Sequence, residues 1–208
     1  MNFTQLLVIL SFFVVLFTYK RYNKLHRILL AILSVSLISE IVCFVLLYMK
    51  TDISLVYSIN TLFHHSLWLL LLFSTTKRKA LFKIVLALYL SYGIMNLIAF
   101  EGIQKFNYNT FIVGAFGYLF FFIWESFYRL KKEDFGFFTS NNYLLIFAPV
   151  LFFFGLSVIF GFKSRELSET VIFGDTRLYT VIGYFVNLVY YGLIIFYMYR
   201  EKTSKHEQ

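Results

Sequence analysis

Long apolar runs separated by short polar connections dominate the 208-residue chain. A helix that crosses a hydrocarbon core of about 30 Å needs about 20 mainly apolar residues. Seven segments have roughly that length, so the pattern predicts an all-α, polytopic membrane protein in which residues 1–208 form one seven-transmembrane-helix bundle. The predicted spans are residues 3–19, 28–49, 54–75, 80–100, 109–129, 142–161 and 177–199.

The overall composition agrees with this prediction. Hydrophobic residues make up 60% of the chain and the mean hydropathy is +0.74, against roughly 45–50% apolar residues in soluble domains. The seven segments leave no room for a separate soluble catalytic or nucleic-acid-binding domain. The first segment lacks preceding basic residues and a small-residue cleavage site, so we expect a retained helix rather than a signal peptide.

The positions of the Lys and Arg residues predict the orientation in the membrane, because cytoplasmic loops carry the excess of positive charge. Most of the 19 basic residues fall in alternate connections, which places the N-terminus outside and the C-terminus in the cytoplasm. The net charge of +8 then suits anionic lipids of a cytoplasmic (inner) membrane and gives no evidence for nucleic acid. On the predicted cytoplasmic side are Lys20, Arg21, Lys24, Arg27, Lys77, Arg78, Lys79, Lys83, Arg129, Lys131, Lys132, Arg200, Lys202 and Lys205.

Several polar side chains fall within the predicted spans, where they are costly unless they face the bundle interior or a water-filled cavity. The stretch "INTLFHHSLWLL" places polar and aromatic residues on one face of the third span, and the seventh span has a similar stripe. At about 1.5 Å of rise per residue, Glu40, His64 and Asn187 lie roughly 14–15 Å below the outer ends of their spans. The residues predicted to converge on a ligand-binding pocket near the midplane are Glu40, Asn60, His64, Trp68, Tyr184, Asn187 and Tyr191.

A second interpretation of the same residues remains open. They could serve only as interhelical hydrogen bonds, each worth about 0.6 kcal/mol in a membrane. His65 lies about 100° around the helix from His64, so we expect it to pack elsewhere rather than share the pocket. The polar connection over residues 161–176 is expected to be a solvated connector, with a lid over the pocket as the alternative.

The chain lacks the motifs of several kinds of membrane or cofactor chemistry. Residues 177–199 contain no Lys, so a retinal Schiff base is not expected. Neither HExxH, GxSxG, GxGxxG nor a P-loop is present, and we expect neither a metal site nor a cofactor. This favours a binding protein over an enzyme.

Three stretches carry a diffuse resemblance: "SLVYSINTLFHHSLWLL", "FYRLKKEDF" and "SNNYLLIFAPVLFFFGLSVIF". They resemble small seven-helix membrane proteins common in Bacteroidota. The resemblance implies a fold like that of the sensory seven-helix modules joined to histidine kinases, with the output domain missing, and implies no particular activity. Those relatives often carry a Glu near the positions of His64 and His65, so no role of such a Glu is transferred.

The sequence thus predicts an integral membrane sensor or accessory binding module. It would hold a small or lipidic ligand in the midplane pocket and act through a separate membrane or cytoplasmic protein partner. Two alternatives stay open. One is a proton-coupled small-molecule transporter that uses Glu40 and His64, and the other is an intramembrane lipid-modifying enzyme with His64 as base.

Overall fold

The structure is a computed structural model that describes residues 3–76, 79–161, 170–174 and 176–203. Each predicted apolar segment forms a helix, so the prediction of an all-helical polytopic bundle is confirmed. Six helices in these ranges are long and apolar enough to cross a membrane, whereas α1 has only 16 residues. The long helices are α1 (Phe3–Thr18), α2 (Lys24–Tyr48), α3 (Ser54–Ser74), α4 (Lys79–Met95), α5 (Tyr108–Lys131), α7 (Asn141–Gly161) and α9 (Leu178–Thr203).

Four shorter elements were not predicted. A π-helical turn η1 (Asn96–Phe100) continues α4, and a short helix α6 (Phe135–Thr139) precedes α7. Strands β1 (Val171–Phe173) and β2 (Thr176–Arg177) pair antiparallel just before α9. Residues 162–169 and 175 of the predicted connector or lid lie outside the described residues.

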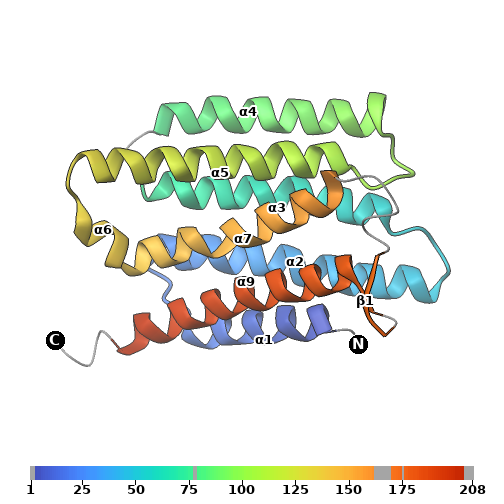
Figure 1. The fold of residues 1–208 in the computed structure, drawn as a ribbon, viewed down its shortest axis with the longest axis horizontal. Coiled ribbons are helices and arrows are strands. Elements are labelled where there is room, and N and C mark those ends of the chain that lie inside the picture. Colours follow the sequence, from blue (N-terminus) through green and yellow to red (C-terminus); the bar gives the residue numbers. More distant parts are fainter. Residues whose placement is uncertain (1–2, 77–78, 162–169, 175, 204–208) are drawn as a thin grey trace.

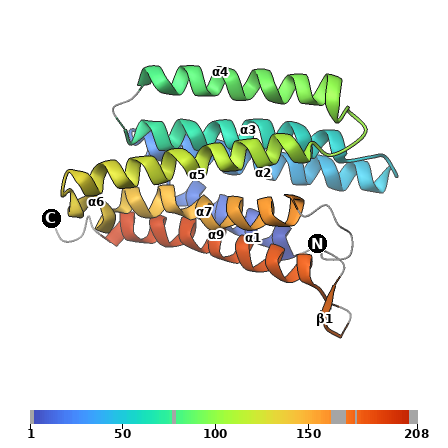
Figure 2. The same cartoon turned by 45° about the horizontal axis from the view of Figure 1, so that its top comes forward.

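Six of the long helices form a closed ring, in the order α1, α2, α3, α5, α7 and α9, with α9 returning to α1. Helix α4 lies outside this ring, where it packs on α3 and to a smaller extent on α5. Figures 1 and 2 both show α4 at one edge of the molecule, with α1 and α9 on the far side. The ring interior is therefore bounded by helices from both halves of the chain.

The two ends of the bundle differ in charge. Helix α1 begins at one end and α9 finishes at the other (Figure 1). We call the end where α2 begins and α5 and α9 finish the basic end, because most of the Lys and Arg residues lie in its connections. At this end Arg129 links α5 to the segment that follows it. Its guanidinium donates to Glu125 Oε1 and Asp134 Oδ2, both at 2.8 Å, and lies over the Phe137 ring.

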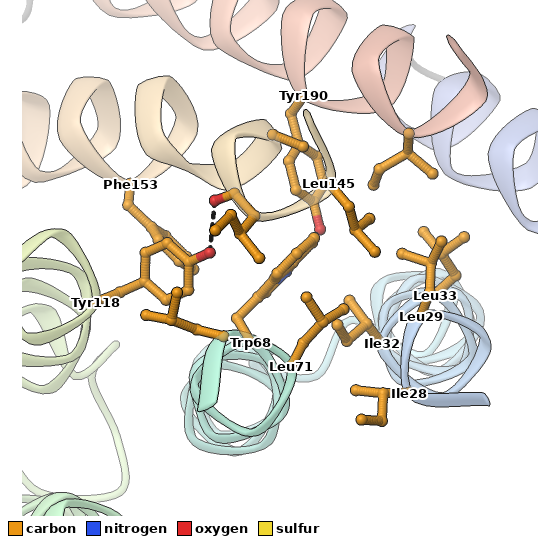
Figure 3. Close-up of a cluster of buried hydrophobic side chains, with 14 of the residues drawn as sticks. Ile28, Leu29, Ile32, Leu33, Trp68, Leu71, Tyr118, Leu145, Phe153 and Tyr190 are labelled. Carbon is orange, nitrogen blue, oxygen red and sulfur yellow. Dashed lines mark hydrogen bonds between the residues drawn. The ribbon is translucent and has the colours of Figure 1, made fainter. Parts of the chain in front are cut away.

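Buried apolar side chains from several helices pack together in a core inside the ring (Figure 3). Pro149 lies inside α7 and removes a backbone donor there. The Tyr118 hydroxyl of α5 donates to Ile146 O of α7 at 2.6 Å, so a neighbouring helix provides a bond to a carbonyl one turn before the proline. Fully buried members of this core are Leu29, Ile32, Leu33, Trp68, Leu71, Tyr118, Leu145 and Tyr190.

The opposite end, where α1, α3 and α5 begin, is called the cavity end below. Helix α3 starts there beside Asp52, whose Oδ1 accepts hydrogen bonds from the Ser54 backbone N–H (3.0 Å) and hydroxyl (2.9 Å). These bonds hold the pKa of Asp52 below its usual value, and the bond from the Ser54 backbone N–H has the larger effect. The carboxylate thus satisfies a free N–H group at the start of the helix.

Candidate functional site

A cavity of about 460 Å³ lies inside the ring at the cavity end, and every helix of the ring contributes to its wall. Its size falls within the range of about 300–1,000 Å³ that is usual for small-molecule sites. The wall combines aromatic rings with polar side chains. The polar and titratable lining residues are Thr4, Ser36, Glu40, Tyr57, Asn60, Thr61, His64, His65, Tyr108, Asn187 and Tyr191.

The cavity has a partly exposed rim and a buried floor. Glu40, Tyr57 and Asn60 are partly exposed, as expected for side chains near the opening. His64 lies ten residues into α3, about 15 Å below the start of that helix, and His64 and His65 are only 6% and 1% exposed. A ligand on the floor would therefore be shielded from both water and lipid.

Five of the seven residues predicted to form the pocket line this one cavity. They come from α2, α3 and α9, which are distant in the sequence, and their side chains converge because these helices border the same interior space. The five are Glu40, Asn60, His64, Asn187 and Tyr191.

The other two predicted residues do not line the cavity. Trp68 is fully buried one helical turn beyond His64, where the packed core begins. Tyr184 is 46% exposed and packs against Phe3 of α1, with 5.3 Å between ring centroids. The sequence stripe gave the correct helical face for Trp68 but could not show how deep the cavity extends.

His65, which we expected to pack elsewhere, lines the same cavity as His64. Helix α3 contacts α2, α5 and α7, so an arc of α3 wide enough for two adjacent residues faces the interior. The aromatic part of the wall, from the segment before α5 and from α5 and α7, was also missed, because Phe occurs in nearly every span and carries no positional signal. These rings belong to Phe106, Phe111, Phe152 and Phe160.

His64 is held by hydrogen bonds that reach into the packed core. The Trp68 Nε1–H group donates to the Tyr190 hydroxyl at 2.9 Å, and His64 Nε2 lies 3.1 Å from the same hydroxyl (Figure 3 shows Trp68 and Tyr190). An indole N–H can only donate, so the Tyr190 oxygen is the acceptor of that bond. We assign the Tyr190 hydrogen to His64 Nε2, because the reverse assignment would leave a buried hydroxyl hydrogen without an acceptor.

This assignment places the His64 proton on Nδ1. Since Nε2 is occupied by Tyr190, Nδ1–H is the ring group that remains for a ligand in the cavity. Its orientation is fixed by two aromatic side chains on α3 and α9, so the donor does not have to be ordered when a ligand binds.

His65 has the same tautomer as His64, but in His65 it is Nδ1 that is bonded to the protein. Its Nδ1 lies 2.9 Å from the Thr61 carbonyl oxygen, which can only accept, so Nδ1 carries the proton. The Nε2 atom is therefore an acceptor, and it is buried without a hydrogen-bond partner in the described part of the chain. The ring stacks on Phe153, with 4.4 Å between centroids and a 20° interplanar angle.

Two amides add further acceptors to the wall. Asn187 Nδ2 donates to Gly183 O of its own helix at 2.7 Å, which leaves its Oδ1 for a ligand. Asn60 Oδ1 is buried and has no partner within the described residues. At the rim, Glu40 Oε2 accepts a bond from Gln5 Nε2 of α1 at 3.1 Å.

The arrangement is suited to binding. The Glu40 carboxylate and Asn187 Oδ1 offer hydrogen-bond acceptors to a molecule in the cavity. Within the described ranges, no three His, Cys, Asp or Glu side chains are grouped so that they could hold a metal ion.

The fold and the site together define a multi-pass α-helical membrane protein with a polar and aromatic cavity between its helices. No family model, curated protein or solved structure matches the chain. The resemblance to small seven-helix proteins of Bacteroidota therefore stays a prediction.

Proposed function

We propose that the protein is an integral membrane sensor or accessory binding subunit that holds a small or lipidic ligand and acts through a separate protein partner. The observation that carries this proposal is the cavity of about 460 Å³, on whose wall polar side chains from α2, α3 and α9 converge. Interhelical hydrogen bonding alone does not account for a cavity of this size among the polar side chains.

We further propose that the chain crosses a cytoplasmic membrane seven times, with its N-terminus outside. Helix α1, at about 24 Å, is short for a full crossing, but it packs between α2 and α9 as a regular member of the ring. The basic end then faces the cytoplasm under the positive-inside rule, and the cavity lies in the outer half of the bundle.

Binding is favoured over transport by the core beneath the floor. Trp68, Tyr118 and Phe153 are fully buried and pack against one another between the cavity and the basic end. A transporter would need a second arrangement in which these side chains separate. A sensor needs only a change of ring packing that a partner can detect.

The test is native mass spectrometry of the full chain extracted from its membrane, with a variant that fills the cavity. Asn60→Trp adds an indole at the rim, and Ile59→Trp adds the same group to the adjacent residue, which is 41% exposed on the outer surface of α3. We expect a bound small molecule in the wild type and in Ile59→Trp, and its loss in Asn60→Trp. Wild-type protein without any bound molecule, or equal occupancy in both variants, would contradict the proposal.

A further inference from the structure

We propose that the ligand of this cavity is a monovalent organic cation, an ammonium group that carries an apolar substituent. This inference rests on the proposed binding function and specifies the chemical class of the ligand. It is drawn from three properties of the wall: its charge, its aromatic faces and its unpaired acceptors.

The charge of the wall is the first argument. Of the described residues that line the cavity, Glu40 is the only one with a carboxylate, and none is Lys or Arg. Glu40 forms no ion pair within the described part of the chain; its neighbours are neutral, the amide of Gln5 and the hydroxyl of Tyr57. An anionic ligand would face this carboxylate without a compensating cation, whereas an ammonium group would supply the opposite charge beside the partly exposed rim.

The aromatic faces are the second argument. Seven Phe and Tyr side chains line the cavity, and they come from α3, α5, α7, α9 and the segment before α5. Aromatic faces attract cations, by about 0.5–1 kcal/mol at exposed positions and by about 2 kcal/mol or more when the pair is desolvated. The same rings cover an apolar substituent, so both parts of such a ligand have a matching surface.

The unpaired acceptors are the third argument. Asn187 Oδ1 remains available because the Nδ2 atom of the same amide bonds to the backbone of its own helix. Asn60 Oδ1 and His65 Nε2 have no donor in the described ranges but are closed to a water molecule. A primary ammonium group provides three donors and no acceptor, so it would pair with the acceptors of Glu40 and Asn187 on the wall. The Nδ1–H group of His64 remains for an oxygen elsewhere on the ligand.

The test compares three probes that share a benzyl group and differ in charge: phenethylammonium, phenethyl alcohol and phenylacetate. Binding is measured by calorimetry on the full chain in zwitterionic phosphatidylcholine nanodiscs. We expect phenethylammonium to bind about tenfold more tightly than the alcohol, since one favourable charge interaction of this kind is worth about 1.4 kcal/mol, and phenylacetate to bind more weakly still.

Glu40→Gln removes the charge but keeps an acceptor for Gln5. It should lower the affinity for phenethylammonium about tenfold and leave the affinity for the alcohol unchanged. The matched control is Glu133→Gln, which makes the same change of charge at an exposed position near the basic end.

The results separate this inference from the proposed function. If the alcohol or phenylacetate binds more tightly than phenethylammonium and Asn60→Trp abolishes that binding, the proposal of a cationic ligand is wrong and the proposed binding function stands. Equal loss of cation binding in Glu40→Gln and Glu133→Gln would also overturn the cationic ligand. If no probe binds the wild type, the ligand class fails, and native mass spectrometry of the extracted protein decides separately whether the binding function fails with it. Should Glu40→Gln not fold, the ranking of the three probes on wild-type protein still decides the ligand class.

Discussion

His64 owes its place in the cavity to a side chain that the sequence stripe did not include. Tyr190 is one residue before the predicted Tyr191, is 1% exposed, and bonds both Trp68 and His64. A donor and an acceptor from one helix therefore meet on a single hydroxyl of another helix. Such a shared group orients the imidazole and joins α3 to α9 at the level of the floor.

Tyr190→Phe should lower stability by about 1–3 kcal/mol, because it leaves the Trp68 N–H and His64 Nε2 buried without partners. Thermal unfolding of the purified protein in detergent measures the effect. Tyr199→Phe, on the same helix but 63% exposed, is the control and should unfold like the wild type. Indistinguishable unfolding of the two variants would show that the shared hydroxyl carries no stability.

Gly114 provides the space in which His65 and Tyr89 lie against α5. A Cβ atom at this position would be 2.8 Å from His65 Cδ2 and 2.8 Å from the Tyr89 ring, whereas a Cβ atom at Gly117 would meet nothing within 4 Å. We expect Gly114→Ala to destabilise the protein by about 1–3 kcal/mol, and Gly117→Ala to have no effect or a slightly stabilising one. Equal unfolding temperatures would mean that the interface adapts to an added methyl group.

At the scale of elements, the apolar pattern was sufficient for the long helices, because a span is defined by its length and apolar composition. The predicted span 80–100 shows that the apolar pattern does not predict local changes of helix geometry. The structure finishes this span as the π-helical turn η1, in which Asn96 Nδ2 donates to Glu101 Oε2 (2.6 Å) and Thr110 Oγ1 (2.9 Å). Contacts between segments decide such local geometry, and a single sequence does not display them.

The position of α4 outside the ring could not be predicted from the sequence either. Lipid tails and protein interiors are both apolar, so hydropathy does not distinguish a helix at the edge from one in the ring. The polar residues of the site gave a better signal, since a strongly polar group has to avoid lipid. That rule identified the faces of α2, α3 and α9 that border the cavity, although it gave neither the depth of the floor nor the part played by His65.

Because Asn96 is the side chain that ties η1 to the start of α5, Asn96→Ala should loosen α4 more than the ring. We expect faster amide hydrogen exchange over residues 79–100 and unchanged exchange in α2 and α9. Ile98→Ala, in the same turn but 73% exposed, should leave exchange as in the wild type. Faster exchange throughout the bundle after Asn96→Ala would show that α4 supports the ring as a whole.

At the scale of the whole molecule, the proposed orientation predicts on which side of the membrane each end is accessible. In a Cys43→Ser background, which removes the single natural thiol, we expect Thr51→Cys at the cavity end to react with a membrane-impermeant maleimide in intact cells. Glu133→Cys near the basic end should react only after the membrane is opened. Both replaced side chains are exposed, so the reverse pattern would mean that the protein is oriented the other way.

The hydrogen bond between Trp68 and Tyr190 has an optical consequence. The chain contains only two tryptophans, and Trp68 is separated from the floor of the cavity by one phenol that also touches His64. In a Trp124→Phe background, the ultraviolet emission of Trp68 would report the hydrogen bonding of that phenol. The protein thus contains its own fluorophore at the base of the cavity, and occupancy could be followed in a cuvette without any attached dye.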